Sequence, residues 1–197
     1  MRTKEGNKER DILSAAINRF AEDGYFNAKI SQIAEDAGVA TGSVYVYYKN
    51  KEDLLNKIFI NLWSELLEKL TVIRNDLGIS PINKMSMTID SVFSVFSENP
   101  SLATVFVNEQ NTVSNKENKP FRTYYNRFLD IGESIVKEGI NSGDFSDDIN
   151  LQVFRHFIFG AIRNSLSFWA ISHDKISLEI IREQSKFLLF KGIEKHH

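Results

Sequence analysis

Cysteine is absent from this chain of 197 residues, and proline and glycine are scarce, with three and ten residues respectively. The lack of cysteine excludes disulfides, thiol nucleophiles and zinc sites built on thiolates. The low proline and glycine content excludes collagen-like or linker-like stretches, and 42% hydrophobic residues is too high a fraction for a disordered chain. No run of about 18 uncharged apolar residues occurs, and the charged start lacks the apolar stretch of a signal peptide. We therefore expect a folded cytoplasmic protein without a membrane span.

Charged and reactive residues give no sign of a catalytic site. Residues 1–51 hold eight Lys and Arg against seven Asp and Glu, and residues 52–197 hold sixteen against nineteen, an asymmetry too weak to indicate a partner. We find no nucleophile beside a base, no cluster of metal ligands and no glycine-rich phosphate loop. His156 and His173 lie far from any such constellation, and His156 is expected to be a hydrogen-bonded core residue. We expect neither an enzyme nor a bound metal or cofactor.

Apolar residues recur at steps of three and four along nearly the whole chain, and the two-residue alternation of strands is missing, so the expected fold class is all-α. Asn50, Ser80-Pro81 and Asn99-Pro100 are typical helix starts, and Ser31 and Thr41 are expected to cap two short helices. Polar residues 108–119 predict a long loop. The other expected helices include 8–23, 51–74, 149–171 and 178–193.

The segment 31–45 predicts a helix-turn-helix. Two short helices meet at a tight turn around Gly38, with small residues Ala34 and Ala37 where the helices cross. In such a motif the second helix enters the major groove of DNA and the first crosses the backbone. Short helices that merely pack together give the same pattern, and the turn alone does not separate the two interpretations.

The second helix of this motif carries more aromatic residues than its core face needs. Val44 and Tyr48 are sufficient to bury it, so Tyr45 and Tyr47 are expected to be exposed and to need a partner. Hydroxyl groups on this face can bond phosphates or base edges, and lysines just beyond can meet phosphates. This surplus favours DNA binding.

Residues 8–55 resemble the DNA-binding domain of the TetR family of bacterial regulators. The resemblance is carried by Ala15-Ala16 with Gly24-Tyr25, by 31–39, and by the run 42–55. It implies a three-helix DNA-binding domain, residues 1–53, followed by a helical ligand-binding and dimerisation domain, residues 54–197. It also implies a homodimer that occupies a roughly palindromic operator as a repressor and leaves it when a ligand spreads the two heads apart.

The same resemblance assigns candidate DNA contacts. Positions matching Tyr45, Tyr47 and Lys51 usually meet phosphates, and those matching Thr41 to Ser43 lie nearest the bases. The full candidate set is Lys29, Ser31, Thr41, Gly42, Ser43, Tyr45, Tyr47, Lys49 and Lys51.

The residues after Lys51 contain thirteen of the fifteen phenylalanines and both tryptophans. The helices 149–171 and 178–193 are apolar over so wide an arc that they are either central or shared with a second chain. Paired across a two-fold axis they would form a four-helix interface. The candidate interface residues are Phe154, Ile158, Ile162, Leu166, Ile181, Phe187 and Leu188.

The stretch 138–145, Phe159-Gly160 and Trp169 are similar to the fatty-acid-degradation regulators within the TetR family. This similarity implies a long-chain fatty acyl-CoA as the ligand, with its acyl tail in an apolar tunnel between helices. The candidate lining residues are Trp63, Leu66, Phe93, Phe96, Phe106, Glu109, Tyr124, Phe128, Phe157 and Trp169.

Two other functions stay open on the sequence. One is a TetR-type repressor of multidrug efflux, whose pocket would take aromatic or cationic drugs and for which Glu109 is a candidate buried acid. The other is a helical lipid-binding or carrier protein that does not bind DNA, which would show no salt-dependent DNA affinity.

Overall fold

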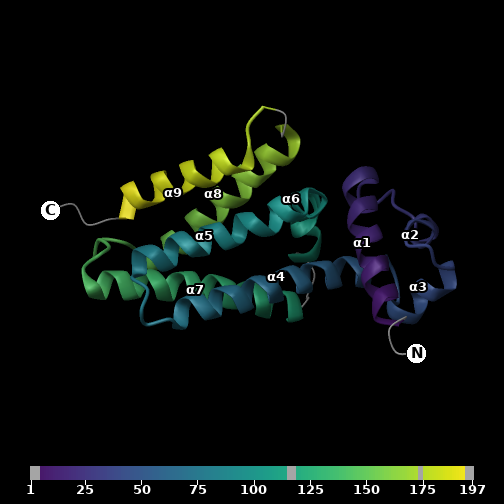
Figure 1. Ribbon diagram of the computed structural model, residues 1–197, viewed down its shortest axis with the longest axis horizontal. Coiled ribbons are helices and arrows are strands. Elements are labelled where there is room, and N and C mark those ends of the chain that lie inside the picture. The colour runs from purple at the N-terminus through teal and green to yellow at the C-terminus, as the bar shows by residue number, and fades with distance from the viewer. Residues whose placement is uncertain (1–4, 115–118, 173–174, 194–197) are drawn as a thin grey trace.

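The computed structural model describes residues 5–114, 119–172 and 175–193, and these residues form helices and no strand, which confirms the all-α expectation. Within these ranges no helix combines the length and apolar character needed to cross a membrane. The helices, shown in Figure 1, are α1 (Glu5–Asp23), α2 (Ile30–Asp36), α3 (Thr41–Tyr47), α4 (Lys51–Asn75), α5 (Pro81–Glu98), α6 (Pro100–Ser114), α7 (Lys119–Ser142), α8 (Leu151–Ser172) and α9 (Leu178–Ile193).

The molecule is elongated, with α1, α2 and α3 forming a head at one end and α5 to α9 a helical bundle at the other (Figure 1). Helix α4 starts at the head and runs along the bundle, where it packs against α7. Helix α6 also contacts the head, because it packs against α1. The head is therefore joined to the bundle through two helices rather than through a flexible linker.

Three helices begin where capping residues predict. The side chain of Asn50 accepts a hydrogen bond from the backbone N–H of Asp53 at 2.8 Å, and that of Asn99 accepts from Leu102 at 3.0 Å. Ser80 caps α5 in the same way. Each bond satisfies one of the N–H groups that a helix start leaves unpaired.

The two short helices do not use the predicted caps. Helix α2 begins at Ile30 and α3 at Thr41, so Ser31 and Thr41 lie inside the helices and Lys29 and Ala40 occupy the cap positions. At the start of α2 the side chain of Gln32 instead accepts from the backbone N–H of Lys29 at 3.1 Å. The hydroxyls of Ser31 and Thr41 are thus not used by these caps.

Two further expectations were wrong. Residues 108–114 belong to α6 and Lys119 opens α7, and the rest of the expected loop, residues 115–118, lies outside the described part of the chain. Polarity had indicated a loop, but Glu109 and Gln110 are good helix formers and are buried. His156 is exposed rather than in the core, because α8 turns this face outward; His173 lies outside the described residues.

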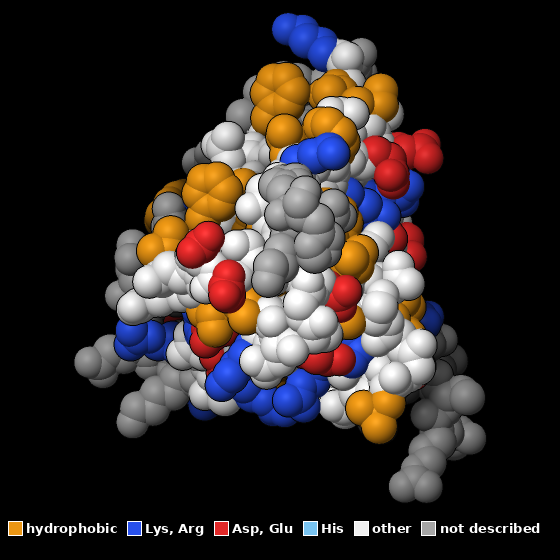
Figure 2. Space-filling model, turned by 90° about the vertical axis from the view of Figure 1, so that its left-hand side faces the viewer, with side chains coloured by type: hydrophobic (Ala, Val, Ile, Leu, Met, Phe, Trp, Pro, Cys, Tyr) orange, Lys and Arg blue, Asp and Glu red, His pale blue; other side chains and the backbone are white. Residues whose placement is uncertain are grey.

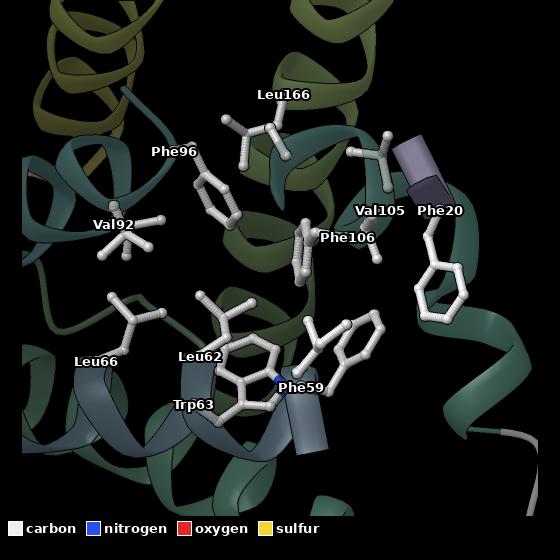
Figure 3. Close-up of a cluster of buried hydrophobic side chains, with 14 of the residues drawn as sticks. Phe20, Phe59, Leu62, Trp63, Leu66, Val92, Phe96, Val105, Phe106 and Leu166 are labelled. Carbon is white, nitrogen blue, oxygen red and sulfur yellow. The ribbon is translucent and has the colours of Figure 1, made fainter. Parts of the chain in front are cut away.

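One hydrophobic core runs from the head into the bundle. Figure 3 shows Phe20 of α1 on one side of α6, near Val105, and Phe106 on the other side, toward Phe96 and Trp63. The rings of Phe106 and Phe96 lie 5.1 Å apart, and those of Phe106 and Trp63 lie 5.8 Å apart. Because protein interiors are close-packed, a change in the packing of the bundle alters the packing of the head.

Candidate DNA-binding surface and ligand cavity

The turn between α2 and α3 fixes how these two helices cross. Gly38 has φ of +64°, a left-handed conformation that favours glycine. Its N–H donates to the carbonyl of Glu35 at 3.0 Å, and the N–H of Val39 donates to that of Ala34 at 2.9 Å. This pair of bonds is a Schellman motif, which ends α2 and aims the chain into α3. The turn predicted at Gly38 is confirmed.

Helix α3 has a buried face and an exposed face. Val44 and Tyr48 are buried, as predicted, whereas Tyr45 is 55% and Val46 79% exposed. The hydroxyl of Tyr48 donates to a carboxylate oxygen of Glu9 at 3.4 Å. Burial, followed by the negative charge of Glu9, raises the pKa of Tyr48 above its ordinary value. Tyr48 therefore fastens the end of α3 to α1, and the opposite face is left to solvent.

The candidate DNA contacts are all exposed or partly exposed. Lys29, Ser31, Thr41, Gly42, Tyr45 and Lys49 are exposed, and Ser43, Tyr47 and Lys51 are partly exposed. A Cβ atom added at Gly42 would meet no heavy atom within 4 Å, so the fold itself does not require glycine there. The structure thus leaves all of these side chains and Gly42 at least partly accessible to a partner.

Lys51 has a structural role that the sequence did not show. Its ammonium donates to the backbone carbonyls of Phe26 and Ala28, each at 2.9 Å, and lies 4.8 Å from the ring centre of Tyr25. These contacts tie the first turn of α4 to the loop that precedes α2. Because an ammonium has three donors, one remains for a phosphate.

Two exposed apolar residues of the head were missed from the sequence. Val46 lies on the open face of α3, and Phe26, in the loop after α1, is also 79% exposed. Val46 could have been found from periodicity, since it lies half a turn from the buried pair Val44 and Tyr48. An apolar side chain at such a position can contact a thymine methyl group.

The bundle encloses a cavity of about 70 Å³, bounded by α4, α5, α6, α7 and α8. Half of the candidate ligand residues line it, namely Trp63, Leu66, Phe96, Phe106 and Phe128. Its wall is mostly apolar, which suits a hydrophobic ligand. The volume is smaller than that of a usual ligand pocket, about 300–1,000 Å³, so a large ligand must displace some of the helices around it.

The other candidate ligand residues lie elsewhere. Phe93 is buried in the core, and Tyr124 and Trp169 pack against the core without lining the cavity. Glu109 is buried, but its carboxylate accepts from the hydroxyl of Thr112 at 3.0 Å and does not line the cavity. Phe157 faces outward and is 70% exposed.

Polar residues on the cavity wall were also missed. The Nη1 atom of Arg155 lies 2.6 Å from Oδ1 of Asp130 and 3.1 Å from Oε2 of Glu133. Two carboxylates of α7 therefore balance the charge of this guanidinium. Arg163, two turns further along α8, has no carboxylate partner among the described residues, and its Nη2 donates to the carbonyl of Val107 at 3.0 Å. Their spacing of eight residues on an apolar helix is the signal that could have placed both on one inward face.

Helices α8 and α9 leave an apolar surface outside the cavity. An open groove of about 680 Å³ lies between them and α5. In Figure 2 hydrophobic side chains gather toward the top, on the side where Figure 1 shows α8 and α9. Exposed apolar residues of these helices are Val153, Phe157, Phe168, Ile180, Phe187 and Leu188. An open apolar groove lined by the exposed residues Val153, Phe157 and Leu188 is typical of a protein interface.

The candidate interface residues fall into three groups. Phe187 and Leu188 are exposed on α9. Leu166 and Ile181 are buried within the chain itself, so they support the core beneath this surface. The third group lines both the cavity and the groove and consists of Phe154, Ile158 and Ile162.

A helix-turn-helix head with an open recognition helix, joined through α4 and α6 to a helical bundle with an internal apolar cavity, defines a class of DNA-binding transcriptional regulators. Comparison with known families agrees with this. Residues 12–58 match the bacterial regulatory proteins of the tetR family, and residues 62–192 match the C-terminal region of YsiA-like proteins. The chain belongs to the TetR family of transcriptional regulators, whose members are not enzymes.

Relatives are similar over nearly the whole chain. The fatty acid metabolism regulator protein of Bacillus subtilis (strain 168) is 29% identical over 186 residues, covering 94% of this chain and 95% of the relative. The crystal structure of FadR from Bacillus subtilis in complex with stearoyl-CoA is 29% identical, covering 94% and 100%, with a TM-score of 0.80. The fatty acid degradation regulator FadR from Bacillus halodurans is 26% identical, covering 93% and 98%, with a TM-score of 0.80.

The matches to the two family models adjoin inside α4, between residues 58 and 62. The predicted division at residues 53 and 54 falls in the first turn of this helix. Since α4 continues through both parts, the division stays a prediction.

Proposed function

We propose that the protein is a homodimeric repressor that binds a roughly palindromic operator and is released by a large hydrophobic effector, a long-chain fatty acyl-CoA. The observation that carries this proposal is the position of the apolar cavity. Its wall includes Trp63 of α4 and Phe106 of α6, and these are the helices that join the bundle to the head. A ligand that widens the cavity must therefore act on the helices that hold the recognition surface.

The nature of the effector is supported by the cavity lining and by the relatives. The wall is apolar over most of its surface, which suits an acyl chain. A related regulator, 29% identical, has been crystallised with stearoyl-CoA. The efflux alternative is less well supported, because Glu109 is away from the cavity and Arg163 on its wall would repel a cationic drug.

The proposed dimer uses the outer face of α8 and α9. Phe157 and Leu188, both exposed in the single chain, line the same groove. A second copy related by a two-fold axis would cover this apolar surface and complete a four-helix interface. Such a dimer would present two copies of α3 to successive major grooves.

The test begins with a duplex selected from random DNA on the wild-type protein. Fluorescence anisotropy then gives the Kd for this duplex at two salt concentrations, with and without stearoyl-CoA. We expect strongly salt-dependent binding that stearoyl-CoA weakens and coenzyme A alone does not. Binding that responds to a cationic dye such as ethidium but not to stearoyl-CoA would indicate the efflux repressor, and no DNA binding at all would indicate the lipid carrier.

A further inference from the structure

Arg163 is a partly buried cation on the cavity wall that has no carboxylate partner within the described residues. Its Nε atom is buried and makes no hydrogen bond to any described residue. Its Nη2 donates to the carbonyl oxygen of Val107 at 3.0 Å. Arg155 lines the same wall but is paired with Asp130 and Glu133. Because a charge removed from water is costly without a counter-charge, Arg163 is the wall residue best placed to gain from an acceptor oxygen of a ligand.

Two other residues of the wall also carry a buried polar atom that has no hydrogen-bond partner among the described residues. The indole Nε1 of Trp63, on α4, and the hydroxyl of Thr88, on α5, are buried without a hydrogen-bond partner in the described chain. The indole N–H and the Nε–H of Arg163 can only donate. Buried polar groups are normally hydrogen-bonded, so three residues of one cavity wall with unpartnered polar atoms leave hydrogen-bonding capacity that a ligand oxygen can use.

We infer that Arg163 binds the oxygen at the polar end of an acyl ligand and that this contact releases α6 from α8. The inference rests on the proposed function and deepens it. Nε and Nη2 lie on the same edge of the guanidinium, so an acceptor at this edge competes with the Val107 carbonyl for the Nη2 donor. A carboxylate and a thioester carbonyl both provide such an acceptor, and an unsubstituted alkyl chain does not.

Helix α6 connects this contact with the head. Val107 belongs to α6, and so does Val105, which faces Phe20 of α1, while Phe106 faces the cavity (Figure 3). All three hydrophobic side chains, Phe20, Val105 and Phe106, are buried. A shift of α6 that follows the loss of the Arg163 bond is therefore transmitted to α1 and to the recognition helix that α1 supports.

The test measures the coupling between ligand and DNA, defined as the ratio of the DNA Kd with a saturating ligand to the Kd without it. The probes are stearoyl-CoA and free stearate, which separate the thioester from the carboxylate as the source of the oxygen. For the wild type we expect a ratio of about tenfold or more with at least one probe. For Arg163→Met we expect a ratio within about twofold of one, although the ligand still binds through its chain and changes tryptophan fluorescence.

Two variants serve as comparisons. Thr88→Val removes only a hydroxyl and should weaken ligand binding about fivefold while the coupling ratio remains. Arg155→Met, on the same wall, should lower thermal stability and leave the ratio unchanged. If Arg163→Met binds no DNA without ligand, Arg163→Gln, which keeps an N–H for the Val107 carbonyl, replaces it.

The outcomes separate this inference from the proposed function. A wild type that binds DNA but responds to neither probe overturns both the effector class and the role of Arg163. A wild type that responds, with an Arg163→Met protein that responds equally, overturns the role of Arg163 alone. In that case the unpartnered atoms serve buried water rather than the ligand.

Discussion

The ammonium of Lys51 lies 2.9 Å from the carbonyl oxygen of Ala28, across the boundary between α4 and the loop before α2. Loss of this bond and of its counterpart at Phe26 frees the loop, so Lys51→Met should lower the stability of the head. Lys49 is the matched control, because it is exposed and its ammonium has no partner among the described residues.

Salt titrations distinguish the two lysines. Lys49→Met should reduce the slope of log K against log salt by about 0.9 for one lost phosphate contact and leave the melting temperature unchanged. Lys51→Met should lower the melting temperature and weaken operator and random DNA alike. A Lys51→Met protein as stable as the wild type would contradict the structural role.

Gly42 lies on the open side of α3, where a Cβ atom would meet nothing within 4 Å. Gly42→Ala should therefore keep or slightly raise the melting temperature, because alanine is favoured over glycine in helices by about 1 kcal/mol. If the backbone of α3 approaches base edges, the added methyl group will still weaken operator binding. Anisotropy and thermal unfolding of the same sample test this, and undiminished operator affinity would place the groove-facing surface elsewhere.

The ion pair between Lys84 of α5 and Glu138 of α7 is asymmetric. The Lys84 side chain is 1% exposed and that of Glu138 is 41% exposed, with the Nζ atom 2.8 Å from Oε1. Glu138→Gln leaves an ammonium buried without a counter-charge and should cost about 3 kcal/mol or more, whereas Lys84→Met leaves a hydrated carboxylate and should cost much less. Urea unfolding of both variants measures the difference, and equal losses would contradict this asymmetry.

Tyr48 should make the protein sensitive to alkali. Burial and the charge of Glu9 raise its pKa in the folded state. The folded state therefore holds this proton more tightly than the unfolded chain, and the stability that follows is present below about pH 10 and is lost as the pH rises above it. Tyr48→Phe should have lower stability at pH 7 but a flatter decline between neutral and alkaline pH. Parallel curves for the two proteins would show that another group governs the alkaline loss.

Charge on the outer face of α8 and α9 should prevent dimer formation. Phe157 and Leu188 are about 70% exposed in the single chain and line the same groove, so Phe157→Glu and Leu188→Glu should leave the monomer folded. Burying either carboxylate between two copies is unfavourable. Analytical ultracentrifugation should find monomers with weakened operator binding. Val72→Glu is the control, since Val72 is an exposed residue of α4 and does not line this groove.

The head was predictable because its signals are local. Gly38, the cap at Asn50 and the pair Val44 and Tyr48 each act within a few residues, and the structure confirms them. Capping at Ser31 and Thr41 was mispredicted, because both residues lie inside their helices and Lys29 and Ala40 occupy the cap positions, and local sequence does not fix a helix boundary to within one residue.

The cavity was only half predictable. Phe93 and Phe96 lie one turn apart on α5 and are both buried, yet only Phe96 lines the cavity. Periodicity shows that a residue faces inward but not which neighbouring helix it meets. For the same reason the bond between Arg163 and Val107 could not be predicted, since the two residues are 56 positions apart along the chain.

The sequence alone determined the helical fold class, the helix-turn-helix and the resemblance to TetR regulators, because these depend on periodicity, turns and short motifs. Tertiary structure decided which side chains surround the cavity, that Lys51 binds two carbonyl groups, and that α6 contacts both the head and the cavity wall. These features depend on the relative positions of helices that are distant in the chain, and such positions are set by the packing of the whole core.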